Sequence, residues 1–388
     1  MFKKHLLTIL LSTHLLVITN GRELSDFSEI YLLTYLPGDE LYSLFGHSAI
    51  RLKDPVQGID FVYNYGTFDF STPFFYIKFI NGNLPYQLSR TTYSTALKQM
   101  KYQERSVLQQ RLALTIDERN QLYNILETEY LPENRSYLYR FFKNNCSTKI
   151  RDVVKSSVVP NIKYEETRKK LTFRQLVHRY VDKKPWAKLG MDLMLGKMAD
   201  NYASTEETMF LPDYLTFHFA LATVNREEGI RGLATRPKTV LNSKEIQQAQ
   251  IFPKPALFFA ILLVLLLALA PKFFPKKSNS TLLDWVLYGT TSIFGLVVLY
   301  VTINSQHPEL GANYNLLWSL PALPVLLLQR GKRLAKSKFA LAVYLTYVFL
   351  LLVVIIGNKW MPQSIPLEIY PFLIMILIHT GLKSVKLI

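Results

Sequence analysis

The stretch FFKNNCSTKIRD, residues 141–152, contains the only cysteine of a 388-residue chain. Asn145, Ser147 and Thr148 flank Cys146, and side chains of these types satisfy the free N–H groups in the first turn of a helix. The stretch therefore predicts a helix that begins near Cys146. A helix N-terminus carries partial positive charge, which lowers the pKa of a thiol placed there and makes a thiolate available near neutral pH.

Two interpretations of this single thiol stay open on the residues alone. Cys146 cannot form an internal disulfide, and a spare exposed thiol is a liability in an oxidising compartment. It is therefore either a small buried apolar residue or a nucleophile. A nucleophile needs a base, and the base needs a group that orients it.

His47 is the histidine best placed to be that base. It stands in LFGHSAIRL, directly after Gly46 and at the start of a predicted strand, a position that holds a ring rigidly. Other histidines fall in the N-terminal apolar segment, in predicted helices, in a loop and in the last apolar block: His14, His178, His218, His307 and His379.

Residues 22–225 have the pattern of an α+β domain. The segment 22–100 is mainly strand-like, because EIYLLTYLPGDELYSLFGHSAIRLKD contains an apolar run, a Pro-Gly-Asp turn and an alternating SAIRL. The following DFVYNYGTFDF is aromatic and β-branched, with Gly66 as a break. These features predict a sheet in the first part of the domain.

Helices are predicted in the second part. Residues 114–130 have apolar spacing near 3.6 and a capping box of Thr115 and Glu118. Residues 170–220 are also helical in pattern and partly apolar, which fits a collar next to a membrane. The segment 226–250 is polar without strong periodicity, so we expect a connector there.

Residues 251–388 contain five long apolar blocks. A transmembrane helix needs about 20 apolar residues, so the blocks predict an α-helical membrane domain of five transmembrane helices. The first and third blocks are short and need their neighbours to span. The blocks are Pro255–Ala270, Leu282–Ile303, Leu316–Gln329, Phe339–Gly357 and Pro366–Leu382.

The charges of the loops predict the orientation of these helices. Lys and Arg gather after the first block, after the third block and in the tail. In contrast, INSQHPELGANYN has none and NKWMPQSIP has only Lys359. Because basic loops stay in the cytoplasm, we expect residues 22–250 on the outer face and the C-terminus inside.

The N-terminal segment, residues 1–21, predicts export of the domain that follows. In MFKKHLLTILLSTHLLVITNG two lysines precede an apolar run, and small or polar residues come after it, as in a signal peptide. Cleavage near Gly21 and retention as an anchor both stay open. In either case the prediction agrees with the loop charges.

The net charge of +16 does not indicate a nucleic-acid partner. Residues 251–388 have 12 Lys/Arg against 3 Asp/Glu, and Lys3 and Lys4 add two positive charges. Most of the basic character therefore flanks apolar segments, and no basic stripe interleaved with aromatic residues is present. The sequence also has no HExxH motif, Cys/His cluster or glycine-rich phosphate loop, so we expect no metal and no cofactor.

Several long motifs resemble one bacterial family of exported domains, which includes the Lnb-type lipoprotein N-acyltransferases. The resemblance covers about residues 25–220 and implies a circularly permuted papain-like fold, in which the histidine precedes the cysteine. The motifs are GDELYSLFGHSAIRL, FVYNYGTFDFSTPFFYIKFINGNLPYQL, RSYLYRFFKNNCSTKIRD, GMDLMLG, MFLPDYL and, outside that range, HPELGANYNLLWSLP.

The resemblance implies that Cys146 is the nucleophile and His47 the base. It leaves the third member open. Asn64, on the strand after the histidine, can accept the ring N–H through its amide oxygen, or it can serve the turn before Gly66; Tyr63 and Asp69 are competitors. Asn145, or a backbone N–H at the start of the Cys146 helix, can form an oxyanion hole.

The resemblance also implies the reaction. A fatty acyl chain would pass from a membrane phospholipid, through a cysteine thioester, to the N-terminal cysteine amine of a diacylated lipoprotein. We accordingly expect a multi-pass protein of the bacterial cytoplasmic (inner) membrane with a periplasmic catalytic domain. Arg135, with its basic neighbours, can hold a phosphate or be a solvated charge. In the loop 305–315, His307 and Asn313 can contact a head group or belong to an ordinary loop.

Two other functions stay open. A cell-wall cysteine peptidase would use the same thiolate and histidine, but it needs an open groove for a polar peptide and often carries wall-binding repeats, which the sequence lacks. A non-catalytic membrane scaffold that binds lipoproteins or lipids would not need the thiol. Replacement of Cys146 by serine distinguishes the scaffold from either enzyme.

Overall fold

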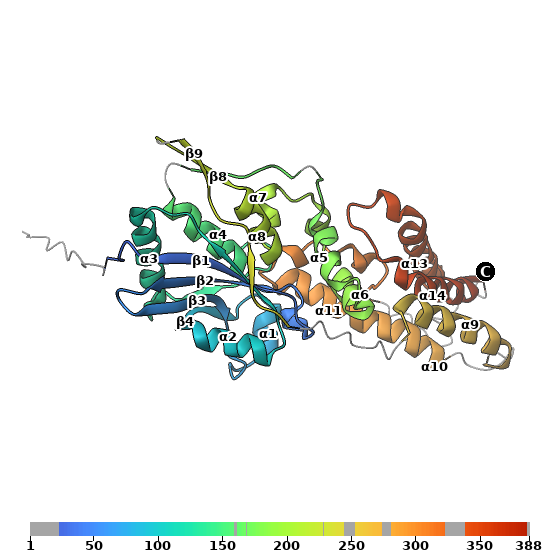
Figure 1. Cartoon of the computed structure of the whole chain (residues 1–388). Helices are drawn as coiled ribbons and strands as arrows, with labels where there is room; N and C mark the ends of the chain where they lie inside the picture. Colours follow the sequence, from blue (N-terminus) through green and yellow to red (C-terminus); the bar gives the residue numbers. More distant parts are fainter. Residues whose placement is uncertain are drawn as a thin grey trace, which may run out of the picture.

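The computed structural model describes residues 23–158, 161–167, 169–227, 229–243, 253–273, 281–322 and 338–385. The predicted export signal, residues 1–21, lies outside them. The chain has the expected α+β class, with a sheet-rich N-terminal domain and a helical C-terminal region. The two lie at opposite ends of an elongated molecule, with α5 (Phe173–Val181) and α6 (Pro185–Met194) between them (Figure 1).

The strands of the described residues form two sheets. They are β1 (Glu29–Tyr35), β2 (His47–Asp54), β3 (Ile59–Thr67), β4 (Pro85–Thr92), β5 (Val107–Arg111), β6 (Ser136–Leu138), β7 (Ile162–Lys163), β8 (Thr223–Arg226), β9 (Gly229–Gly232) and β10 (Lys238–Leu241). The larger sheet has seven strands in the order β10-β5-β1-β2-β3-β4-β6, and its pairs are antiparallel. The smaller sheet contains β7, β8 and β9.

Helices cover both faces of the larger sheet. On one face, α3 (Ile116–Tyr130) and α4 (Cys146–Ser157) share a hydrophobic core with the strands. On the other face, α2 (Tyr93–Tyr102) packs against a smaller core that includes Ala49 and Val62. Side chains alternate between the faces of a strand, so this arrangement accounts for the alternating pattern in the sequence.

Two helix starts follow the sequence prediction. The Thr115 hydroxyl accepts from the Glu118 N–H, and the Glu118 carboxylate accepts from the Thr115 N–H, so the predicted capping box is confirmed. Helix α4 begins at Cys146 with Asn145 as its N-cap. Each cap of this kind stabilises a helix by about 1 kcal/mol.

The segment 170–220 is helical, as predicted, and contains α5, α6, η2 (Lys197–Asp200), α7 (Thr205–Thr208) and α8 (Pro212–Leu221). The segment 226–250 differs from the plain connector that we expected. There β9 forms a hairpin with β8, and β10 pairs with β5 at the edge of the larger sheet. Because β10 is mostly exposed, its sequence has no apolar alternation that would have revealed it.

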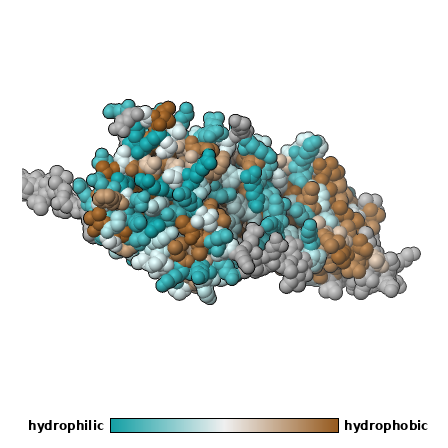
Figure 2. All heavy atoms as spheres, in the orientation of Figure 1, coloured by the Kyte–Doolittle hydropathy of each residue, from teal (hydrophilic) through white to brown (hydrophobic). Residues whose placement is uncertain are grey.

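The C-terminal region contains three described helices long and apolar enough to cross a membrane. They are Trp285–Asn304, Lys338–Trp360 and Leu367–Val385, and they correspond to the second, fourth and fifth predicted blocks. Figure 2 shows the hydrophobic surface that gathers on this end of the molecule.

The other two predicted spans are not found as such. The first block lies in α9 (Pro255–Phe273), whose described apolar part, Pro255–Leu265, is shorter than a span. Half of the third block, Leu316–Gln329, falls outside the described residues. Of the five predicted spans, three are therefore confirmed in the part of the chain that the structure describes.

The elements of this region also include short helical turns and a π-helical segment. They are α10 (Thr281–Asp284), η3 (Trp285–Gly289), α11 (Thr290–Asn304), η4 (Pro308–Leu310), η5 (Tyr314–Leu317), α13 (Lys338–Gly357), η6 (Asn358–Trp360), η7 (Leu367–Ile369) and α14 (Tyr370–Val385).

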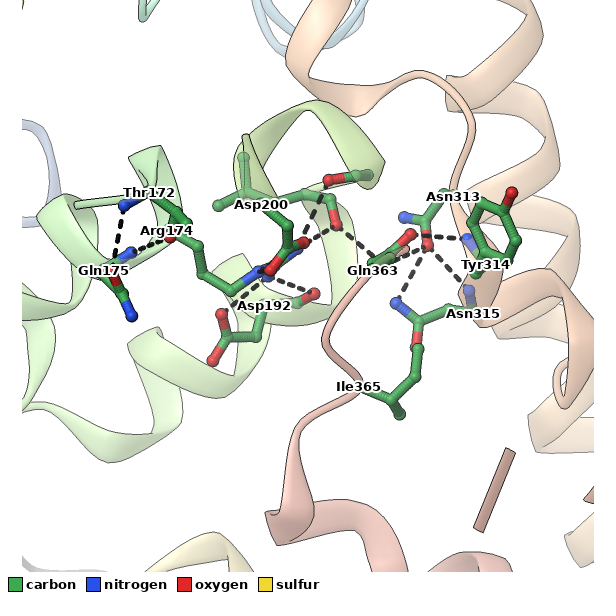
Figure 3. A network of polar contacts seen from close by, with 12 residues as sticks. Thr172, Arg174, Gln175, Asp192, Asp200, Asn313, Tyr314, Asn315, Gln363 and Ile365 are labelled. Atoms are coloured by element: carbon green, nitrogen blue, oxygen red, sulfur yellow. Dashed lines mark hydrogen bonds and ion pairs between the residues drawn. The ribbon is translucent and has the colours of Figure 1, made fainter. Parts of the chain in front are cut away.

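Loops at one end of the membrane helices bind the N-terminal domain through a polar network (Figure 3). Asn313 donates to the carbonyl oxygen of Leu193 at 2.9 Å, and its Oδ1 accepts from Gln363 Nε2 at 3.1 Å. Gln363 also donates to the carbonyl oxygen of Leu195, which accepts from buried Arg174. The two loops predicted on the outer face thus both contact the N-terminal domain.

A close backbone approach makes this junction tight. The Gly196 N–H donates to the carbonyl oxygen of Glu309 at 2.8 Å, and a Cβ added at Gly196 would overlap the carbonyl oxygen of Gly311. The motif GMDLMLG therefore meets HPELGANYN, which lies about 115 residues later in the chain, at one interface. This interface is close-packed, like a protein interior.

Candidate active site

Cys146 is the first residue of α4 and is buried, with 7% of its surface exposed. The Asn145 side chain caps the helix: its Oδ1 accepts from the N–H groups of Ser147 and Thr148, both at 2.9 Å. The Thr148 hydroxyl in turn accepts from the Asn145 N–H at 2.8 Å. The sulfur therefore lies at the positive end of a well-capped helix.

The Asn145 amide is fully used in this role. Its Nδ2 donates to the carbonyl oxygens of Phe141 and Phe210, both at 2.8 Å. These bonds hold the loop before the helix in place. Both ends of the Asn145 side chain are thus engaged, and the Ser147 and Thr148 N–H groups donate to it, so the Cys146 N–H is the better placed oxyanion donor.

His47 is the first residue of β2, and its neighbours restrict its ring. The ring stacks on Tyr35, its cross-strand partner in β1, with centroids 5.7 Å apart. The preceding Gly46 has a φ of +75°, and a Cβ there would lie 2.8 Å from the Tyr35 carbonyl oxygen. Glycine is thus required for the chain to turn into the strand at the histidine.

The third candidate, Asn64, lies on β3 and is hydrogen-bonded to His47. The distance between His47 Nε2 and Asn64 Oδ1 is 2.5 Å. Because an amide oxygen only accepts, Nε2 carries the hydrogen and donates. The other ring nitrogen, Nδ1, is then left for the thiol.

The surroundings of Cys146 lower its pKa to about 7, although burial by itself raises it. The positive charge of the His47 ring and its hydrogen bond to the sulfur outweigh burial, and the Ser48 N–H and the Ser147 hydroxyl add to the effect. In the same way burial lowers the pKa of His47, but the Cys146 thiolate and Asn64 raise it overall. The pair therefore favours a thiolate beside an imidazolium.

Gly66 lies beside His47 and Cys146, and its lack of a side chain leaves room for both. It has a φ of +103°, at an irregularity in the pairing of β3 with β4. A Cβ at this position would lie 3.4 Å from His47 Cε1 and 3.7 Å from Cys146 Cβ. Any side chain here would touch both members of the pair.

The competitors for the third position face elsewhere. The Tyr63 hydroxyl donates to Glu127 of α3 at 2.5 Å, on the sheet face covered by that helix. Asp69 is exposed and accepts from the N–H and the hydroxyl of Ser71. Asn64 is thus the one of these three that contacts His47.

Two of the predicted substrate-binding residues, His307 and Asn313, lie at the junction with the membrane helices. His307 is buried, and its Nε2 donates to the carbonyl oxygen of Phe79 at 3.0 Å. Asn313 takes part in the polar network described above. Arg135 lies in the turn before β6, where its carbonyl oxygen accepts from the Leu88 N–H. Both His307 and Asn313 therefore hold the two domains together.

Basic neighbours of the cysteine motif also have protein partners. Arg140 donates to the carbonyl oxygen of Gly82 and to Gln306, and Lys149 pairs with Glu129. Both side chains are thus held by contacts within the protein. Among the residues that the structure describes, no group of three or more His, Cys, Asp or Glu could hold a metal ion.

Two residues that contribute to the site, Arg105 and Glu309, were not predicted from the sequence. Arg105 is buried and donates to the carbonyl oxygens of Tyr35 and Leu36, close enough for the Cys146 charge to act on it. Buried Glu309 accepts from the Phe141 N–H at 3.2 Å, so the membrane-side loop supports the segment that precedes the nucleophile. Nothing local in the sequence marks either contact.

Two family models match the chain. One is described as the Lnb N-terminal periplasmic domain and matches residues 22–179. The other is described as the Lnb transmembrane domain and matches residues 246–387. The first match includes the cysteine–histidine pair, and the second includes all three described spans. No curated protein and no solved structure matches the chain.

Proposed function

This chain belongs to the Lnb family, as a membrane protein with a periplasmic domain, and we propose that it is a lipoprotein N-acyltransferase. The observation that carries the proposal is the thiol of Cys146, with its pKa of about 7, beside a histidine that Asn64 orients. Such a pair suits acyl transfer through a thioester. We extend the proposal to a permuted papain-like fold for the N-terminal domain and to a multi-pass protein of the inner membrane.

The first step forms the acyl enzyme. The Cys146 thiolate attacks an ester carbonyl carbon of a membrane phospholipid, and the Cys146 N–H at the start of α4 stabilises the oxyanion. When the C–O bond breaks, the imidazolium of His47 gives its proton to the leaving oxygen. The products are a thioester on Cys146 and a lyso-lipid.

The second step transfers the chain. The free α-amine of the N-terminal cysteine of a diacylated lipoprotein attacks the thioester carbonyl carbon. His47, now neutral, accepts a proton from the attacking nitrogen. The C–N bond forms, the C–S bond breaks, and the thiolate is regenerated. Conversion of a thioester to an amide is downhill, so two easy steps replace one hard step.

The attachment to membrane helices supports this pair of substrates. A phospholipid and a diacylated lipoprotein both lie in the outer leaflet. An enzyme fixed at that leaflet meets them by diffusion in a plane, and the entropy cost of bringing the groups together is reduced. A peptidase acting on soluble wall fragments would gain nothing from the same anchoring.

The acyl enzyme is the intermediate to look for. Purified protein in nanodiscs that contain phosphatidylethanolamine should gain the mass of one fatty acyl chain, and treatment with neutral hydroxylamine should remove it. The mass should be on the peptide that contains Cys146 and absent from a Cys146→Ser variant. Failure of the wild-type protein to gain an acyl chain under these conditions would reject the proposed first step.

A further inference from the structure

The segment after β3 exposes an unusual amount of apolar surface. Helix α1 (Phe75–Ile80) has no buried residue. In the run FSTPFFYIKFI, residues 70–80, the single charge is Lys78. Contiguous exposed patches of this kind mark interaction sites rather than ordinary surface. The large exposed side chains are Phe70, Phe74, Tyr76, Ile77, Phe79 and Ile80.

The backbone holds this surface outward at some cost. Phe74, the residue before α1, has a φ of +58° and is 77% exposed. A left-handed conformation in a bulky residue is strained. No burial of the Phe74 side chain against the described residues offsets this strain. The strained backbone therefore holds an exposed aromatic ring at the surface.

The helix lies at the outward end of a membrane span. Asn81, just after α1, donates to the Tyr300 hydroxyl of α11 at 3.0 Å. The Ser305 hydroxyl, one residue beyond α11, donates to the carbonyl oxygen of Ile80 at 2.6 Å. Tyr300 and Ile303 of α11 are themselves exposed. The apolar surface of the span therefore continues onto α1.

Aromatic rings connect α1 with the active site. Phe75 lies 5.7 Å from Phe68 between ring centroids, and Phe68 lies 5.2 Å from Tyr86. Tyr86 stacks on Tyr139 at 4.5 Å. Tyr86 also lies 6.4 Å from Tyr137 between ring centroids, and Tyr137 packs against the hydrophobic core cluster that contains Cys146.

We propose that α1 inserts into the outer leaflet and brings the acyl chains of the donor phospholipid to Cys146. Aromatic residues favour the membrane interface, and an interfacial helix buries its apolar face about 5–10 Å into the head-group boundary. Lys78 faces anionic head groups. The occupant of this surface is a lipid bilayer, and the identification of the bilayer lipid as acyl donor rests on the proposed function.

Depth measurements test the insertion without any need for activity. Tyr76→Cys and Val56→Cys are each made in a Cys146→Ser background, labelled with bimane and placed in nanodiscs of phosphatidylethanolamine and phosphatidylglycerol. Val56 is a matched control, because it is 67% exposed, against 73% for Tyr76, and lies in the turn after β2, beyond the end of that strand opposite His47. A lipid with a shallow doxyl group should quench the Tyr76 label several-fold more than the Val56 label. Iodide, which stays in the water, should quench the Val56 label more than the Tyr76 label.

Equal quenching of the two labels would overturn the insertion. A second variant then tests the delivery of lipid. Tyr76→Ser with Ile77→Ser should slow thioester formation from phosphatidylethanolamine on the order of tenfold, with an unchanged rate of Cys146 alkylation by iodoacetamide. An unchanged thioester rate, or an equal fall in alkylation, would overturn the delivery role. If wild-type protein forms no thioester, the proposed function fails, and the quenching result still decides the insertion.

Discussion

His47 Nε2 donates to Asn64 Oδ1 across adjacent strands, at 2.5 Å. This bond fixes which ring nitrogen is protonated, and it leaves Nδ1 for the thiol. The sheet thus orients the base, while α4 independently positions the nucleophile. The site is assembled where the two meet, beside Gly66.

Removal of the orienting amide should reduce acyl transfer. In Asn64→Ala the imidazolium loses a hydrogen bond to a charged group, worth about 1.5–3 kcal/mol, so the transfer rate should fall by about 10- to 100-fold. Asn64→Asp keeps an acceptor and should retain more activity than the alanine variant. The measurement is the rate of lipopeptide acylation in nanodiscs. An alanine variant with the wild-type rate would remove Asn64 from this role.

The reactivity of Cys146 should depend on pH with a midpoint near 7. Below it the thiol is protonated and slow, and above it the thiolate reacts. In His47→Gln burial is no longer opposed by the imidazolium, so the pKa of the thiol rises and the midpoint should move upward by about 1–3 pH units. Iodoacetamide alkylation between pH 5 and 10 measures both curves.

The Cys146→Ser variant provides the background for this alkylation, since Cys146 is the only cysteine. Coincident curves for wild type and His47→Gln would show that the histidine does not set the thiol's pKa. The thiolate–imidazolium account would then be wrong.

Gly66→Ala should impair the site more than the fold. Both Gly66 and Gly58 have positive φ, so alanine at either should cost on the order of 1–2 kcal/mol of stability. Only at Gly66 does the added Cβ contact His47 and Cys146, whereas nothing lies within 4 Å at Gly58. Cys146 alkylation should therefore slow in Gly66→Ala and remain normal in Gly58→Ala, at similar losses of thermal stability. Equal alkylation rates would contradict the packing described around the pair.

The junction between the domains should be sensitive at Gly196. Alanine there would overlap the Gly311 carbonyl oxygen and should lower the thermal midpoint in detergent, because overpacking costs about 1–3 kcal/mol. Gly190→Ala is the matched control: Gly190 lies inside α6 with nothing within 4 Å, and alanine should leave the midpoint unchanged or raise it. A Gly196→Ala protein as stable as the control would mean that the junction is looser than its contacts suggest.

The sequence predicted those parts of the site that depend on local signals. The helix that begins at Cys146 and the capping box at Thr115 follow from short-range hydrogen-bonding preferences. His47 was identified because it follows a glycine at the start of a predicted strand. Asn64 was identified because it lies on the next predicted strand. These residues are close in the chain or on neighbouring strands, so a motif could reveal them.

Contacts between distant segments were not predictable in the same way. Tyr35 stacks on His47 only because of the register between β1 and β2. Arg105 reaches the site from the loop before β5, and Glu309 reaches it from the membrane side. For Asn313 the sequence left contact with a head group and an ordinary loop open, and did not indicate that its amide binds backbone carbonyls about 120 residues away in the chain.

The most direct test of the account is the mass of the N-terminal lipopeptide of a reporter lipoprotein. The host should lack its own N-acylation and should express either this protein or its Cys146→Ser variant at equal membrane levels. We predict the gain of one amide-linked fatty acyl chain with the wild-type protein and no gain with the variant. A gain with both proteins, or with neither, would contradict acyl transfer through Cys146.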